Sequence, residues 1–255
     1  MKKKEKSKKK RKAGSVVLTV ILIICIVVFC VSAYHLYKIM NNYHKSNEEY
    51  DVVQQEVVEE TDDGFFVDFD KLQAQNPDCI GWIRFENLDI SYPIMKGTDN
   101  EYYLHHTING SYLYAGSIFM NYQNASDFSD MNTFIFGHNM KNDSMFGLLG
   151  DFKDKEVYEK NPCFWIYTPE GAHRYDIFSC YVADADEDTY TVYHGQGEAY
   201  DKYVKQLKEN SAYPIDVDVD GTDKIVTLST CTAEGYDYRY IVNGVLAETI
   251  PTDEQ

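Results

Sequence analysis

The segment Lys224–Leu246 reads KIVTLSTCTAEGYDYRYIVNGVL and contains two runs of apolar and β-branched residues, which are separated by small and polar ones. Such runs are typical of β-strands, and the residues between them predict a turn. Alternation along the first strand places Val226 and Leu228 on one face and Cys231 on the other, more polar face. A thiol at a strand end is therefore a candidate nucleophile. If the second strand is antiparallel to the first, its initial residue Arg239 returns close to that thiol.

Further strands are expected on both sides of this segment, because short apolar runs alternate with turn-forming residues such as Asn109-Gly110. The other predicted strands are Ile90–Met95, Ser117–Met120, Thr133–Phe136, Cys163–Tyr167 and Tyr175–Val182. The predicted helices are Phe69–Gln75, Ser144–Phe152 and, most clearly, Glu198–Glu209, in which apolar residues recur at helical spacing. The pattern predicts a mainly β, antiparallel barrel or sandwich with helices inserted between strands.

A nucleophilic cysteine needs a base, because the thiolate is the reactive form. Among the seven histidines, His138 resembles Cys231 in its position, since it follows the predicted strand Thr133–Phe136 through Gly137. His105 and His106 lie in a polar segment, and adjacent side chains diverge, so we do not expect a metal site there. His138 is the candidate base, and Arg239 could donate hydrogen bonds to an oxyanion.

The N-terminus has a different composition from the rest of the chain. Residues 1–12 carry nine basic side chains and one acidic one, whereas the whole chain has a formal charge of −17. Residues 13–34 carry no charge. A helix of this many residues is about 33 Å long, which is enough to cross a hydrocarbon core of about 30 Å. Basic residues on the N-terminal flank predict a cytoplasmic N-terminus and an extracellular remainder. A cleaved signal peptide is the alternative, but the apolar stretch is longer than such peptides require.

These features divide the chain into a basic cytoplasmic tail (1–12), a membrane-spanning signal anchor (13–34), an acidic juxtamembrane stalk (35–62) and an extracellular domain (63–255). The last part has the size of a single domain with one core. Because it is strongly acidic and no basic stripe follows the N-terminus, nucleic-acid binding is excluded.

Four of the six cysteines lie outside the apolar span, which permits two disulfides in an exported domain. None of them is closely spaced, however, and Cys163 and Cys180 lie within apolar strands, where cysteine is usually a small buried side chain. We expect no disulfide at Cys231.

The sequence resembles the sortases, the cell-envelope transpeptidases of Gram-positive bacteria. The resemblance rests on TLSTC (Thr227–Cys231) followed by Arg239, and on GHNM (Gly137–Met140) after a strand. It extends through NPDCIGWI (Asn76–Ile83), YYL (Tyr102–Leu104), GSIF (Gly116–Phe119) and SMFGLL (Ser144–Leu149), and covers Phe69–Ala247. The helix before the cysteine strand, the N-terminal helix and a C-terminus too short for a second span look like class B.

The resemblance implies a closed β-barrel of about eight strands with an N-terminal helix and a helix inserted before the cysteine strand. It implies that Cys231 attacks the carbonyl of the threonine in a C-terminal sorting motif, so that the bond after threonine breaks and a thioester forms. It also implies that His138 transfers protons and that Arg239 stabilises the oxyanion. It further implies that Thr230, Ser229 and Asn139 contribute to substrate binding. The expected partners are surface proteins that carry the motif, an amine acceptor of the cell-wall precursor and the plasma membrane. No metal or organic cofactor is implied.

Two other classes compete with this interpretation. A papain-like protease would place the cysteine at the start of a helix and before the histidine, whereas here His138 precedes Cys231. A non-enzymatic surface-displayed β-domain, or an inactive sortase-like scaffold, would share the fold. Replacement of Cys231 separates these from the enzyme, because a binding module would keep its ligand affinity.

Overall fold

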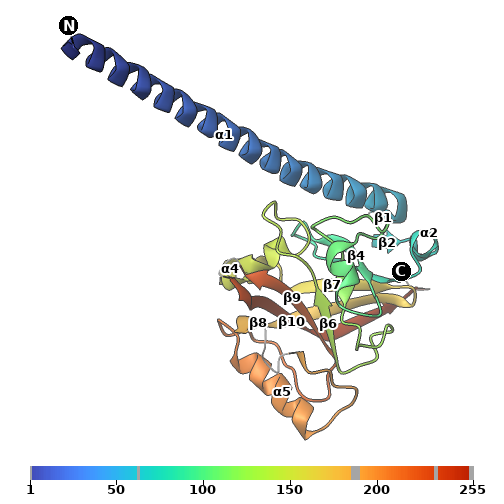
Figure 1. The fold of residues 1–255 in the computed structure, drawn as a ribbon. Helices are drawn as coiled ribbons and strands as arrows, with labels where there is room; N and C mark the ends of the chain where they lie inside the picture. The colour runs from blue at the N-terminus through green and yellow to red at the C-terminus, as the bar shows by residue number, and fades with distance from the viewer. Residues whose placement is uncertain (1, 62–63, 185–189, 233–234, 253–255) are drawn as a thin grey trace. The chain divides into compact units, whose positions relative to one another are not determined.

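Eight strands close into one barrel in the order β10-β8-β7-β3-β4-β5-β6-β9 (Figure 1). The computed structural model describes residues 2–61, 64–184, 190–232 and 235–252. The barrel strands are β3 (Cys79–Arg84), β4 (Ser91–Met95), β5 (Ile118–Met120), β6 (Asn132–Phe136), β7 (Cys163–Thr168), β8 (Gly171–Asp184), β9 (Ile225–Thr232) and β10 (Gly235–Pro251). Two more strands, β1 (Val58–Thr61) and β2 (Gly64–Val67), form a small antiparallel sheet. The expected mainly β, closed barrel is confirmed.

The barrel is mixed, so the expectation of an antiparallel structure was wrong in part. β4 pairs with β5 in parallel, and β6 pairs with β9 in parallel. Parallel neighbours require a connection that returns the chain to the same end of the barrel. The chain between β4 and β5 makes this return through helix α3 (Tyr102–His105), and β7, β8 and helix α5 (Glu198–Glu209) lie between β6 and β9. Parallel pairing brings the C-terminal ends of β6 and β9 to the same edge.

The helices match the sequence expectation where the apolar spacing is clear. Helix α2 (Phe69–Gln75) has the predicted bounds. Asp68 is its N-cap residue, and the Asp68 carboxylate accepts a hydrogen bond from the Lys71 amide. The predicted helix Ser144–Phe152 is a 3₁₀ helix, η1 (Gly147–Lys153), and the short helix α4 (Lys155–Lys160) and strand β3 were not predicted. The apolar run in β3 is interrupted by Gly81 and directly follows the turn-forming residues Asn-Pro-Asp, so its strand pattern is weak.

Helix α5 covers the outer face of the barrel beside β8 (Figure 1), and it has the predicted bounds. Phe178 in β8 is fully buried and belongs to a cluster with four residues of α5: Tyr200, Tyr203, Val204 and Leu207. The amphipathic helix thus supplies the second layer of the core.

The first helix, α1 (Lys2–Val57), belongs to two units. Residues 1–45 form one unit, and the compact unit with the barrel begins at Ser46, inside the predicted stalk. Within the compact unit, Tyr50, Val53 and Val57 are buried, and the Tyr50 hydroxyl donates to the Gly116 carbonyl at 2.6 Å. The end of α1 is therefore part of the folded domain rather than a spacer.

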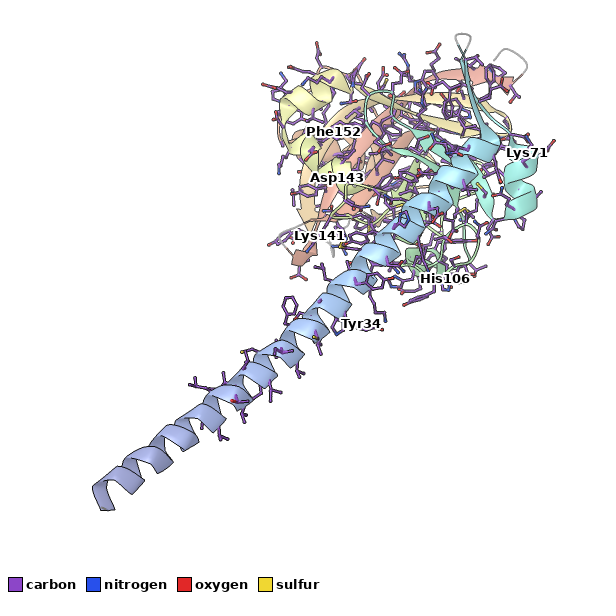
Figure 2. All side chains as sticks on the ribbon, turned by 90° about the horizontal axis from the view of Figure 1, so that it is seen from above. Tyr34, Lys71, His106, Lys141, Asp143 and Phe152 are labelled. Carbon is purple, nitrogen blue, oxygen red and sulfur yellow. The ribbon has the colours of Figure 1, made fainter. Side chains whose placement is uncertain are left out.

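The N-terminal unit contains the one helix of the described chain that is long and apolar enough to cross a membrane, with the apolar stretch starting at Val16. Its large apolar side chains are exposed, as Figure 2 shows for the part of the helix that leads to Tyr34.

Candidate active site

His138 and Cys231 lie on neighbouring chain segments because β6 and β9 are parallel. Phe136 is opposite Ser229 in this pair, and the Gly137 amide donates to the Ser229 carbonyl at 3.2 Å. His138 and Cys231 each lie two positions further along the same alignment. Since adjacent strands are about 4.8 Å apart, the imidazole and the thiol come from the same edge of the barrel.

Arg239 lies on the other side of Cys231. It is the direct partner of Cys231 in the antiparallel pairing of β9 and β10. Directly opposite residues have Cβ atoms about 5 Å apart and on the same face. His138, Cys231 and Arg239 therefore form a row across three neighbouring segments, as the sequence predicted for the cysteine and the arginine. The guanidinium is held by a bond from its Nη1 to the Tyr238 carbonyl, at 2.9 Å.

Glycine at position 137 is required by close packing. A Cβ atom there would overlap the Ile118 side chain and the Phe146 ring. Because glycine has no Cβ, the chain can leave β6 against this layer and carry His138 to the edge.

The environment of His138 specifies which nitrogen is basic. Its Nε2 lies 2.8 Å from the Leu104 carbonyl. A carbonyl only accepts, so Nε2 carries a proton, and Nδ1 is the unprotonated nitrogen of the neutral ring. Tyr114 and His105 stack on the ring, with centroids at 5.1 and 5.8 Å. Burial lowers the pKa of His138 below its ordinary value, which favours the neutral imidazole.

The three residues expected to bind substrate are placed differently from one another. The Asn139 side chain donates from Nδ2 to the Cys231 carbonyl at 2.7 Å, which links the histidine segment to the cysteine strand. The Ser229 hydroxyl is 2.8 Å from the Tyr190 hydroxyl, and Thr230 faces the opposite side of β9 from Cys231. Ser229 and Thr230 are both 2% exposed. A contact of Ser229, Thr230 or Asn139 with a substrate stays a prediction.

Several neighbours of the site were missed by sequence reasoning. His105 lies at the end of α3, where its ring stacks on the His138 imidazole. Leu104 contributes a backbone carbonyl, for which a sequence carries no side-chain signal, and Tyr114 precedes the GSIF motif without a helical or strand pattern.

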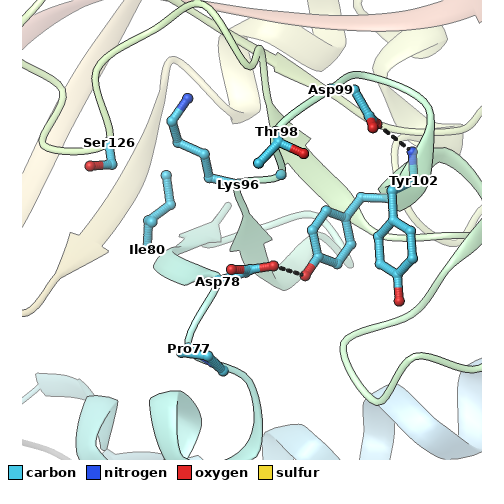
Figure 3. Close-up of a pocket in the computed structure, with 10 residues that line it drawn as sticks. Pro77, Asp78, Ile80, Lys96, Thr98, Asp99, Tyr102 and Ser126 are labelled. Atoms are coloured by element: carbon cyan, nitrogen blue, oxygen red, sulfur yellow. Dashed lines mark hydrogen bonds between the residues drawn. The ribbon is translucent and has the colours of Figure 1, made fainter.

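A pocket of about 490 Å³ borders the same helix, α3 (Figure 3). Its lining includes Tyr102 and Tyr103 of α3, while the next two residues of that helix contact His138. The pocket thus borders the helix that contacts His138, but its lining does not include His138, Cys231 or Arg239.

A cysteine, a histidine and an arginine thus lie on neighbouring segments at one edge of a closed mixed barrel, and the family comparisons identify the class of enzyme as a cysteine transpeptidase. The sortase domain profile matches residues 83–247. Sortase B of Listeria monocytogenes is 37% identical over 178 residues, which are 69% of this chain and 72% of that protein. The chain belongs to the sortase family, and its relatives identify it as class B.

Solved structures agree with this assignment. Sortase B from Bacillus anthracis in complex with AAEK1 has a TM-score of 0.73 and 29% identity, over 82% of this chain and 100% of that one. A Staphylococcus aureus sortase B–substrate complex has a TM-score of 0.71 and 25% identity, over 80% of this chain and 97% of that one. The barrel with its N-terminal and inserted helices is therefore a sortase fold.

Proposed function

We propose that the chain is anchored in the plasma membrane by the apolar part of α1 and joins surface proteins to an amine of the cell wall. The substrate would carry a C-terminal sorting motif that is cleaved after threonine. The membership in the sortase family supports the cell-wall reaction, and the apolar stretch from Val16 supports the anchor.

In the first half of the reaction, the Cys231 thiol gives its proton to the unprotonated Nδ1 of His138, and the resulting thiolate attacks the carbonyl carbon of the threonine. Negative charge develops on the carbonyl oxygen, and Arg239, directly opposite Cys231, donates hydrogen bonds to it. His138 gives a proton from Nδ1 to the leaving amine while Nε2 stays bound to Leu104. The C–N bond breaks, and a thioester on Cys231 remains.

In the second half, the acceptor amine attacks the thioester carbonyl and loses a proton to His138 Nδ1. The C–S bond then breaks, the new amide is released and the Cys231 thiolate is regenerated. Because burial lowers the pKa of His138, its protonated form is a minor one in the free enzyme, and the ring returns readily to the neutral base.

The observation that carries this proposal is the alignment of three segments at one edge, with His138 on one side of Cys231 and Arg239 on the other. This alignment supports a mechanism in which the thiol attacks a carbonyl carbon, the guanidinium binds its oxygen and the imidazole serves the leaving nitrogen. No other cysteine of the described chain outside the apolar span shares such neighbours: Cys79 and Cys180 are buried, and Cys163 faces Asp176 across β7 and β8.

Mass spectrometry of the full chain with a panel of sorting-motif peptides tests the proposal. We expect one peptide to add its N-terminal portion to Cys231 as a thioester, and Cys231→Ala to abolish the adduct. His138→Ala should slow acylation by about 10²–10⁴-fold. An adduct that persists in Cys231→Ala, or a folded wild-type protein that binds the peptides without acylation, would contradict the mechanism.

A further inference from the structure

A continuous row of aromatic and imidazole rings leads across the surface to the catalytic histidine. Its members are Tyr102, His106, Tyr112 and His105, and it ends on His138. The ring centroids are 4.1 Å apart from Tyr102 to His106, 5.3 Å from His106 to Tyr112 and 5.8 Å at each of the last two steps. We call these four residues the aromatic row.

The two tyrosines of the aromatic row are exposed, its two histidines are half-buried, and the row is conformationally fixed. Tyr112 is 72% exposed and Tyr102 is 46% exposed, and His106 lies at the periphery of the domain (Figure 2). His106 and Tyr112 form a β-bridge, and His106 Nδ1 lies 2.8 Å from the Tyr102 carbonyl. Exposed aromatic rings that cluster in this way mark binding surfaces. A surface that is already ordered loses little entropy when a ligand binds.

The pocket beside α3 continues the row, because Tyr102 contributes to both (Figure 3). Its volume of about 490 Å³ is in the range of small-molecule sites. The polar lining consists of two carboxylates, one ammonium and two hydroxyls, from Asp78, Asp99, Lys96, Thr98 and Ser126.

Two of the charged groups are oriented by the protein itself. Asp78 accepts from the Tyr103 hydroxyl at 2.7 Å, and Lys96 donates to the Asn121 and Tyr122 carbonyls at 3.2 and 3.1 Å. The pocket therefore offers fixed donors and acceptors next to aromatic faces.

This combination fits a saccharide. A pyranose ring presents a face of C–H groups, which stacks on the electron-rich face of an aromatic ring, and hydroxyl and acetamido groups around its rim, which hydrogen-bond to carboxylates and hydroxyls. An apolar protein partner would need a continuous hydrophobic patch instead of a polar pocket beside single rings. The row ends on His138, the group that takes the proton of the acceptor amine.

We propose that the aromatic row and the adjoining pocket bind the amino-sugar part of the cell-wall precursor whose amine attacks the thioester. The proposal rests on the proposed function, since it assigns the acceptor side of that reaction. The sugar rings would stack on Tyr102 and Tyr112, and the peptide part of the same precursor would run along the row towards His138.

The test measures binding to the full-length Cys231→Ala chain, so it does not depend on acyl transfer. The probes are an N-acetylglucosaminyl-N-acetylmuramyl tetrapeptide and the same tetrapeptide without sugars, compared by calorimetry in detergent. We expect the sugar-bearing probe to bind on the order of tenfold more tightly, and the double variant Tyr102→Ala/Tyr112→Ala to lose this difference. The ring-preserving variant Tyr102→Phe/Tyr112→Phe should retain it. Tyr158→Ala, on α4 outside the row and the pocket, should retain it as well.

Equal affinity for the two probes in the parent chain would overturn the proposal, and so would an unchanged difference in the double alanine variant. If the alanine variant instead weakened a sorting-motif peptide and left the sugar-bearing probe unaffected, the surface would belong to the first substrate. A chain that forms no thioester but still prefers the sugar-bearing probe would refute the proposed function and leave this inference standing.

Discussion

At the scale of single residues, the surroundings of Cys231 come from the two segments on either side of strand β9. His138 reaches Cys231 by parallel alignment and Arg239 by antiparallel pairing. The Asn139 side-chain amide donates to the Cys231 carbonyl and so links the segment after β6, which carries His138, to strand β9. A single substitution of His138, Arg239 or Asn139 removes one of these neighbours, and the three substitutions should change the kinetics of the reaction in different ways.

Replacement of Arg239 by lysine should lower kcat/KM for transpeptidation by on the order of 10²-fold or more. Lysine keeps the charge but loses the planar donor pair that can contact a substrate carbonyl and the oxyanion together. Steady-state kinetics with the preferred peptide measures the loss. Arg174→Lys is the matched control, because Arg174 forms surface ion pairs with Asp176 and Glu248. Unchanged turnover in Arg239→Lys would mean that charge alone suffices.

Replacement of Asn139 by alanine should slow acylation by roughly three- to tenfold, because one hydrogen bond that positions Cys231 is lost. Asn139→Asp should be worse, since a carboxylate cannot donate to the Cys231 carbonyl and repels it. Single-turnover thioester formation gives the rates, and thermal unfolding of both variants controls for stability. Equal rates for wild type and Asn139→Asp would rule out this positioning role.

The lowered pKa of His138 predicts how stability depends on pH. The unfolded chain takes up a proton on this residue as the pH falls through about 6.5, whereas the folded chain, with its lower pKa, does so only at lower pH. His138 therefore makes the free energy of unfolding fall as the pH decreases from about 7.5 to about 5.5. Urea unfolding should show a smaller fall for His138→Gln. Identical pH slopes for the two proteins would contradict the assigned shift.

At the scale of elements, the end of α1 supports the loop beside the active site. The Tyr50 hydroxyl bonds to the Gly116 carbonyl and lies 3.0 Å from the Ser117 hydroxyl. Gly116 has φ of +55°, and a Cβ atom there would overlap the carbonyls at the end of α3, so only glycine allows this approach. The preceding Tyr114 stacks on His138. The segment from Ser46 thus supports the loop that carries Tyr114 to the His138 ring.

A chain that begins at Ser46 should fold, whereas one that begins at Gly64 should lose several kcal/mol of stability. The shorter chain lacks Tyr50, Val53 and Val57, and full burial of one such apolar side chain contributes about 1.5–3 kcal/mol. Denaturant unfolding of the two chains measures the difference. Tyr50→Phe in the longer chain keeps the ring and should cost only about 1 kcal/mol for the lost hydrogen bonds. Equal stability of the two chains would show that α1 is a spacer after all.

At the scale of the whole molecule, the charge asymmetry predicts the topology. The basic residues 2–12 should stay in the cytoplasm, and the domain from Ser46 should lie outside. Protease added to intact protoplasts should therefore digest the domain and leave an N-terminal tag protected. A soluble mature protein that begins near Tyr34 would show instead that the apolar segment is a cleaved signal.

Local patterns in the chain were sufficient to predict several parts of the structure. The helices Phe69–Gln75 and Glu198–Glu209 have the expected bounds, because apolar spacing and acidic N-terminal residues are properties of the segment itself. The β character of the domain and the pairing of Arg239 with Cys231 also follow from residues that are close in the sequence. The choice of His138 as the candidate base came from its position after a strand and from the motif resemblance, and it stays a prediction.

Contacts between segments that are distant in the sequence could not be predicted from local patterns. The parallel alignment of β6 with β9, the bond from His138 to the Leu104 carbonyl and the packing of Tyr50 on Gly116 all join residues far apart in the chain. Strand order and backbone partners leave no periodic signal in a sequence, because they depend on which surfaces meet after the barrel closes. Local chemistry therefore determined the elements and the reactive side chains, and long-range packing determined which of them share one active site.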